Sequence, residues 1–188
     1  MARQKYQGAP WLYDDTTGDI VGVKDPDGSE FYFQRTPRVG LFHDNTTQVA
    51  ALPNTAYAMT LGETDLSRGI SIVDSSKITV NRAGIYNIQF STQLDRTNAG
   101  NDIVDIWFRK NGVDLSDSNT KVTISGNANA SKTVAAWNFF GQASAGDYFQ
   151  VMWNTPDVRV RLHYEAAGTS PTRPITPSVI VTVNEVAE

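Results

Sequence analysis

The feature that most constrains the fold of this chain is the alternation of apolar and polar residues with a period of two. Tyr86, Ile88 and Phe90 alternate with polar residues in 86–91, and residues 178–183 carry valine at every second position. Successive side chains of a β-strand point to opposite faces, so this spacing is typical of strands with one buried face. Apolar residues at helical spacing are nowhere sustained over three turns. The sequence therefore predicts an all-β protein.

Two parts of the chain differ in the length and spacing of their apolar runs. Residues 1–44 contain short apolar pairs between Asp, Gly and Pro, whereas residues 45–188 contain longer alternating runs separated by turn residues. We predict strands at 47–52, 56–61, 69–73, 77–80, 85–94, 102–110, 120–125, 133–141, 147–154, 158–164 and 178–186. Turn signals spaced by roughly 8–12 residues are typical of a sandwich or barrel. We therefore expect one sandwich domain at 45–188, preceded by a short β-rich segment at 1–44.

Several turns can be predicted from their chemistry. The pair Asn111-Gly112 favours a type I′ hairpin, which needs positive φ at both residues. Residues 25–28, Asp-Pro-Asp-Gly, favour a tight turn between two short strands. We expect the carboxylate of Asp147 to accept hydrogen bonds from loop amides, and residues 165–177, with one glycine and three prolines, to form a loop.

Composition excludes several classes of function. The 188 residues include no cysteine, which indicates a reducing compartment. The net charge is −4 with no cluster of Lys or Arg, so we expect no nucleic-acid partner. No apolar run approaches the roughly 20 residues of a membrane span, so we expect no membrane partner. The N-terminus has no apolar signal region, and we expect synthesis in a reducing cytoplasm.

Residues with catalytic chemistry are few. His43 and His163 have no nucleophile or zinc-ligand spacing around them, and we expect both to be ordinary polar residues. Asp114, Asp117 and Ser118 form a polar cluster that favours a solvated loop, with a small ion or sugar site as the alternative. We therefore expect no enzyme activity, no metal and no cofactor.

Four short motifs of the second part carry a family resemblance. They are Ala-Gly-Ile-Tyr at 83–86, Phe-Arg-Lys-Asn-Gly at 108–112, Ala-Gly-Asp-Tyr-Phe at 145–149 and Ser-Val-Ile-Val-Thr-Val at 178–183. In order and spacing, over about 140 residues, they resemble the C1q/TNF-like jelly-roll domain. The resemblance implies a jelly-roll sandwich that assembles as a homotrimer.

The N-terminal segment carries a second resemblance. Residues 13–22 with Pro-Asp-Gly at 26–28 resemble the anchoring segments that begin some bacteriophage head-decoration, fibre and tail proteins. A jelly roll with no cysteine, no signal peptide and no collagen-like stalk is likewise similar to the version found in phage virion proteins.

Aromatic and apolar residues provide the candidate sites. The capsid-anchoring candidates of the first segment are Trp11, Tyr13, Ile20, Val21, Phe31 and Phe33. The candidates for the sandwich core or the trimer interface are Tyr86, Phe90, Trp107, Trp137, Phe149 and Trp153. Four Trp, eight Phe and seven Tyr exceed what one small core readily absorbs, which favours an interface for some of them.

These observations lead to two functional hypotheses. In the first, the chain decorates and cements a phage capsid as a trimer on the outer surface, anchored to the major capsid protein or another virion protein through residues 1–44. In the second, it is a head-fibre or tail-fibre module whose loops at 95–101, 126–131 and 165–177 bind host surface glycans.

Overall fold

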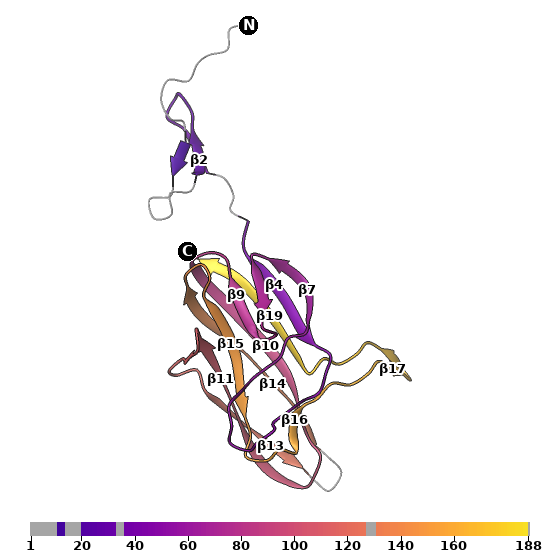
Figure 1. Cartoon of the computed structure of the whole chain (residues 1–188). Helices are drawn as coiled ribbons and strands as arrows, with labels where there is room; N and C mark the ends of the chain where they lie inside the picture. The colour runs from indigo at the N-terminus through magenta and orange to yellow at the C-terminus, as the bar shows by residue number, and fades with distance from the viewer. Residues whose placement is uncertain (1–10, 14–19, 33–35, 127–130, 188) are drawn as a thin grey trace. The chain divides into compact units, whose positions relative to one another are not determined.

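The computed structural model describes residues 11–13, 20–32, 36–126 and 131–187 (Figure 1). The chain divides into two compact units, Met1–Pro37 and Arg38–Glu188. Every strand pairing in the described residues is antiparallel, and these residues contain no helix. The prediction of an all-β protein is confirmed.

The first unit contains a three-stranded sheet in the order β1-β2-β3, which we call the N-terminal sheet. Its strands are β1 (Trp11–Tyr13), β2 (Ile20–Lys24) and β3 (Glu30–Tyr32). The turn between β2 and β3 forms as predicted: the amide of Gly28 donates to the carbonyl of Asp25 at 2.9 Å. Gly28 has φ +92°, which a residue with a side chain rarely adopts.

The second unit is a sandwich of two sheets. In the first sheet, β10 lies between β14 on one edge and β19 with β16 on the other, and β4 and β7 continue beyond β19. The strands are β7 (Glu63–Arg68), β4 (Val39–Asp44), β19 (Val179–Ala187), β10 (Gly84–Arg96), β14 (Ser131–Ala143), β16 (Val160–Leu162) and β5 (Gln48–Val49). Strands far apart in the sequence are thus neighbours, as β4 and β19 in Figure 1 illustrate.

In the second sheet, β11 lies between β15 and β13, and β15 continues to β9 and β8. The strands are β8 (Ile70–Val73), β9 (Lys77–Val80), β15 (Tyr148–Asn154), β11 (Gly100–Lys110), β13 (Thr120–Gly126), β6 (Tyr57–Ala58) and β12 (Val113–Asp114). The hairpin between β11 and β12 has φ +48° at Asn111 and +82° at Gly112, so the type I′ prediction is confirmed.

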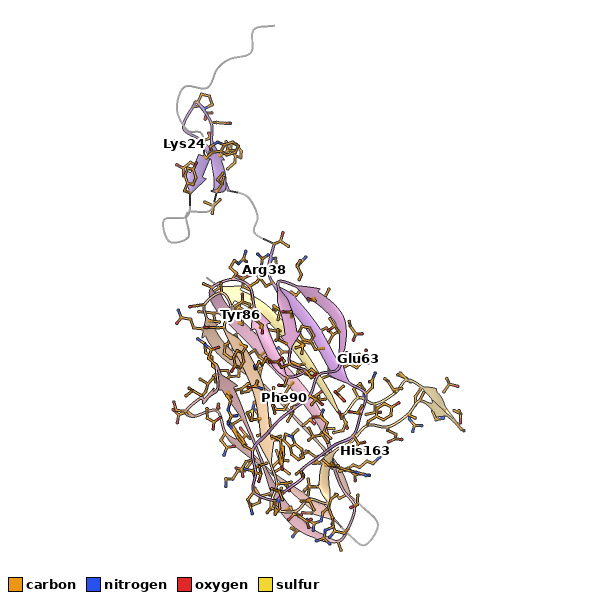
Figure 2. All side chains as sticks on the ribbon, viewed as in Figure 1. Lys24, Arg38, Glu63, Tyr86, Phe90 and His163 are labelled. Carbon is orange, nitrogen blue, oxygen red and sulfur yellow. The ribbon has the colours of Figure 1, made fainter. Side chains whose placement is uncertain are left out.

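The alternation seen in the sequence places the core between the two sheets. Tyr86, Ile88 and Phe90 of β10 are buried, as are the three alternating valines of β19 (Tyr86 and Phe90 are labelled in Figure 2). Phe90 packs edge-on against Trp137 of its own sheet and against Phe108 of the opposite sheet, at centroid distances of 4.6 and 5.9 Å. The contact between Phe90 and Phe108 joins the two sheets, because the two rings come from opposite layers.

The predicted boundary between residues 44 and 45 is wrong, because β4 belongs to the sandwich. It pairs with β19 on one side and β7 on the other, and Phe42 is fully buried. The strand was hard to recognise because Gly40 and Asp44 share its inward face with Phe42, so its alternation is weak. A Cβ on Gly40 would lie 2.4 Å from the ring of Phe42, so this glycine makes room for that side chain.

Residues between β16 and β19 were predicted to be a loop, and this is wrong in part. β17 (Gly168–Thr169) and β18 (Thr172–Arg173) form a small two-stranded hairpin. Figure 1 shows this segment leaving the side of the sandwich.

Candidate functional site

The N-terminal sheet gathers large apolar side chains on one face. Trp11, Val23 and Phe31 are paired directly across the three strands, and directly opposed residues of antiparallel strands share a face. Tyr13 shares that face because it lies two residues after Trp11, and it pairs with Ile20. We call this the apolar face of the N-terminal sheet: Trp11, Tyr13, Ile20, Val23 and Phe31.

The apolar face is open to solvent, whereas the opposite face carries charge. The exposed fractions are 46% for Trp11, 51% for Tyr13, 49% for Ile20 and 55% for Phe31. On the other face Lys24 and Glu30 are paired across the strands and form an ion pair of 3.2 Å. A small sheet with one aromatic face and one charged face is suited to dock by the aromatic side.

The predicted anchor residues are therefore placed as follows. Trp11, Tyr13, Ile20 and Phe31 lie on the apolar face. A bulge after Leu12 leaves Val21 without a partner in β1, so cross-strand pairing does not assign it to this face; its side chain is half-buried. Phe33 lies outside the described residues. Sequence reasoning missed Val23, whose place opposite Trp11 depends on the register of the two strands.

Most of the candidate aromatic residues of the sandwich are core residues. Tyr86, Phe90, Phe149 and Trp153 are buried, and Trp137 packs partly buried against them. Trp107 does not fill the space between the sheets. Val104, Ile106 and Phe108 face inward on β11, so the alternation places Trp107 on the outer face of the second sheet.

The outer face of the first sheet is rich in side-chain amides. The amide of Asn138 on β14 donates to Asn87 on β10 at 3.2 Å, and Asn87 donates to Asn184 on β19 at 3.4 Å. Gln89 and Asn138 line a shallow hollow of about 260 Å³ beside them. Hydrogen-bonded amides in a row across three strands form a neutral surface, whose burial removes no charge from water.

The edge strand β14 carries apolar side chains on this same outer face. Val134 and Phe140 are 57% and 56% exposed, while Ala135 of the same strand faces the core. Among the described strands β14 pairs only with β10, so its other edge has no strand partner. A long strand with apolar residues on both faces and one open edge is a surface that proteins normally cover. In the sequence, apolar residues at both odd and even positions of 133–141 are the signal that could have indicated this exposed apolar surface.

A second hollow lies on the outer face of the second sheet beside Trp107. Its volume is about 590 Å³, and it is lined by Asp105, Trp107, Asp114, Leu115, Asp117, Asn119 and Asn154. The indole Nε1 of Trp107 donates to Asp114 at 2.8 Å. Hydrogen bonds from Arg109 and Trp107 lower the pKa of Asp114, so this carboxylate is charged at neutral pH. Ser118, which the sequence placed in the cluster, is buried and donates to the carbonyl of Leu115.

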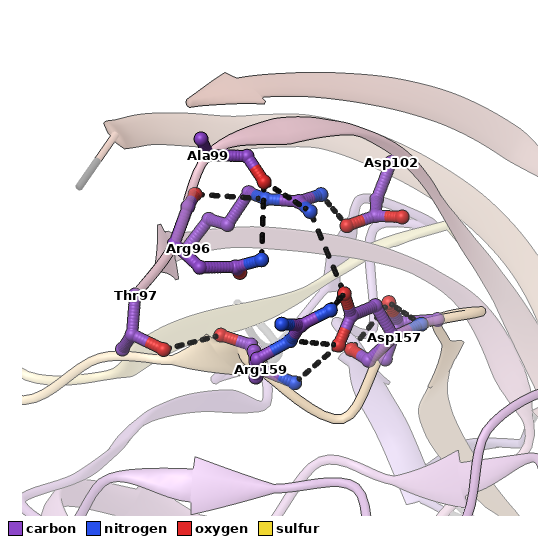
Figure 3. A network of polar contacts seen from close by, with 8 residues as sticks. Arg96, Thr97, Ala99, Asp102, Asp157 and Arg159 are labelled. Carbon is purple, nitrogen blue, oxygen red and sulfur yellow. Dashed lines mark hydrogen bonds and ion pairs between the residues drawn. The ribbon is translucent and has the colours of Figure 1, made fainter. Parts of the chain in front are cut away.

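A polar network fixes the end of the sandwich where β10 turns into β11 (Figure 3). The buried guanidinium of Arg96 pairs with Asp102 and with Asp157 and donates to the carbonyls of Asn98 and Ala99, each at 3.0 Å. These contacts compensate the buried charge of the guanidinium, whose burial without partners would be strongly unfavourable. The network is thus a structural support for the loop at 97–99.

The two histidines have polar partners. His43 lies on β4, and its Nδ1 is 3.0 Å from Asp65. His163 follows β16, and its Nδ1 is 3.6 Å from Asp95, which Arg161 also contacts at 2.6 Å. Burial lowers the pKa of His163. Within the described ranges no three His, Asp or Glu residues are arranged to hold a metal ion.

Comparisons with known proteins add no relative to this picture. No protein-family model matches the chain, and no curated protein matches it either. In the part of the chain that the structure describes, no helix has the length and apolar character needed to cross a membrane.

Proposed function

We propose that this chain is a virion structural protein that decorates and cements a phage capsid, docking through the apolar face of its N-terminal sheet. The observation that carries the proposal is the aromatic face itself. Trp11, Tyr13 and Phe31 are about half exposed on a separate three-stranded unit. Burying this aromatic face against a partner would both stabilise the small sheet and provide affinity.

The size of this effect can be estimated. An aromatic side chain buries about 150–250 Å² in a core, so one that is half exposed has about 100 Å² left to bury. At about 25 cal/mol per Å², Trp11 and Phe31 together contribute about 5 kcal/mol, or roughly a 10³–10⁴-fold change in affinity. Three such anchors on one trimer would act together and add avidity.

The sandwich supports the oligomeric part of the proposal. Its open edge strand β14 and the neutral row of amides on the outer face of the first sheet are suited to contact other copies of the chain. The passage of the chain between sheets, from β10 to β11, from β13 to β14 and from β14 to β15, supports the proposal of a jelly roll of the C1q/TNF type. On this proposal the protein is a homotrimer on the capsid exterior without catalytic activity.

The test uses the full-length chain and capsids assembled without it. The double variant Trp11→Ser with Phe31→Ser should lose co-sedimentation with capsids, because its apolar face no longer fills partner pockets. The matched control, Lys24→Ser with Glu30→Ser, changes the opposite face of the same sheet and should co-sediment like the unaltered chain. Equal binding of the aromatic variant and the control would refute docking by this face.

The position of β4 determines how truncations should be made. Removing residues 1–37 should leave a folded sandwich that does not coat capsids. Removing residues 1–44 deletes β4 from between β7 and β19 and should unfold the sandwich. Circular dichroism and urea unfolding separate the two outcomes.

The hollow beside Trp107 favours a second candidate function, binding of a host glycan. An indole side chain among carboxylates and amides offers an apolar surface for sugar C–H groups and acceptors for hydroxyl groups. If this function is correct, Trp107→Ala should abolish binding on a glycan array, while the control Trp11→Ala should leave it unchanged. Absence of any glycan binding by the unaltered chain would reject it.

A further inference from the structure

The segment between β16 and β19 is an ordered arm. We define the arm as residues 165–177; Figure 1 shows it projecting from the side of the sandwich at β17. Gly168 pairs with Arg173, and Thr169 with Thr172. At the base, Glu165 and Thr176 exchange two backbone hydrogen bonds of 2.9 and 2.8 Å. Among the described strands, β17 and β18 pair only with each other.

Ion pairs link the base of the arm to β14. Glu165 accepts from Lys132 of β14 and from Arg173 of β18, both at 2.8 Å. The guanidinium of Arg173 lies over Gly168, where a Cβ would be 2.3 Å from Nη1. The arm is therefore linked to β14 at its base and folded back on itself.

The tip of the arm is suited to burial. Thr169, Ser170, Pro171 and Thr172 are exposed and carry no charge. A two-stranded hairpin alone is marginally stable in water, so an arm of this kind gains stability by docking. Burial of these four tip residues removes no charged side chain of the tip from water.

We propose that the arm docks on the open edge and outer face of β14 in a second copy of this chain. This inference rests on the oligomer in the proposed function. The argument for a second copy is complementarity: the tip offers hydroxyl and backbone groups, and the region around Ala136 on β14 offers side-chain amides, exposed apolar residues and an edge without a strand partner. Strand addition at such an edge is a common mode of recognition.

The symmetry of the contact is also favourable. The arm and the β14 edge are different surfaces of one chain, so each copy gives an arm to one neighbour and receives one from another. A contact of this head-to-tail kind closes into a ring when the rotation between copies permits. A trimer clasped in this way would have three equivalent arm contacts.

The absence of cysteine from the sequence permits a direct test. We would prepare full-length Thr172→Cys and full-length Ala136→Cys, mix them, oxidise them and examine non-reducing gels. The expected result is a disulfide-linked heterodimer of the two variants. The matched control replaces Ala136→Cys by Thr123→Cys, an exposed position on β13, which pairs only with β11 among the described strands. This control should give at least tenfold less linked product.

Sedimentation of the same samples separates the possible failures. The chain could form an oligomer in which Thr172→Cys links to Ala136→Cys no better than to Thr123→Cys. That result would overturn the arm inference and leave the proposed oligomer unaffected. A chain that remains monomeric at micromolar concentration would overturn both. In a clasped trimer, Thr172→Asp should weaken association at least tenfold, because it places an unpaired charge in the contact; unchanged association would contradict the clasp.

Discussion

Replacement of Arg96 by methionine removes the cation at the centre of the network in Figure 3. Methionine retains much of the apolar stem, so the change chiefly removes the guanidinium and its contacts. Asp102 loses its ion pair, Asp157 loses one of two cationic partners, and the carbonyls of Asn98 and Ala99 lose their donor. The variant therefore leaves a carboxylate with little solvent access and no cation.

The expected cost follows from burial. The Arg96 side chain is 4% exposed and that of Asp102 is 12% exposed, so solvent screens their interaction weakly. Removing one partner of such a pair costs about 3–5 kcal/mol in unfolding free energy. A domain has about 5–15 kcal/mol in total, so the loss would be a large share of the stability. Asp157 is less affected, since hydrogen bonds from Arg159 are the main cause that lowers its pKa to about 2.

Urea unfolding followed by tryptophan fluorescence measures the loss, with the slope m reporting whether the unfolded surface has changed. The matched control is Arg159→Met, which removes a 59% exposed cation from the same network and should cost much less than Arg96→Met, because solvent screens an exposed ion pair. Adding Asp102→Asn to Arg96→Met should restore part of the stability, because it removes the unpaired charge. If Arg96→Met costs no more than Arg159→Met, the network does not support this end of the sandwich.

Three further predictions concern other parts of the sandwich. The pKa of Asp147 is lowered from 3.8 to about 2, chiefly by the amide of Ser144 and then by Lys110. The ionised carboxylate therefore contributes roughly 1–2 kcal/mol of stability above pH 4, and this contribution is lost as the pH falls toward 2. In urea unfolding, Asp147→Asn should lose less stability than the unaltered chain between pH 5 and pH 2.5. Gly112→Val should cost about 1–2 kcal/mol in the same assay, because φ of +82° strains a branched side chain; an unchanged urea midpoint would contradict this. Phe140→Ser should change the unfolding free energy of the monomer by no more than about 0.5 kcal/mol, since the ring is already exposed. The same variant should weaken self-association in sedimentation. A large loss of stability would show that the ring is part of the core.

Several local features could be predicted because they depend on neighbours in the sequence. The buried faces of β10 and β19 follow from alternation alone, and Asn111-Gly112 specifies its own turn. Asp147 was expected to accept loop amides, and it accepts the amide of Ser144 at 2.8 Å. In each case the residues that determine the local structure lie within a few positions of one another in the sequence.

Other features escaped prediction because long-range pairing decides them. β7 was not predicted: all six of its residues are exposed, and it is a strand only because β4 provides its hydrogen bonds. Trp107 was grouped with the candidates for the core or the trimer interface because it is large and apolar, but the register of β11 directs Phe108 into the core instead. The value of an aromatic residue as a candidate site depends on which face it occupies, and composition does not report the face.

By itself the sequence determined that the protein is all-β, that its long strands bury alternate residues, and where its tight turns lie, because a period of two and positive φ are local properties. Only the tertiary structure decided that β4 joins the sandwich, that Trp11, Val23 and Phe31 form one row, and that β14 has an open edge beside a projecting arm. These follow from which strands pair and in what register, and backbone hydrogen bonds between distant segments leave little trace in the sequence of either segment.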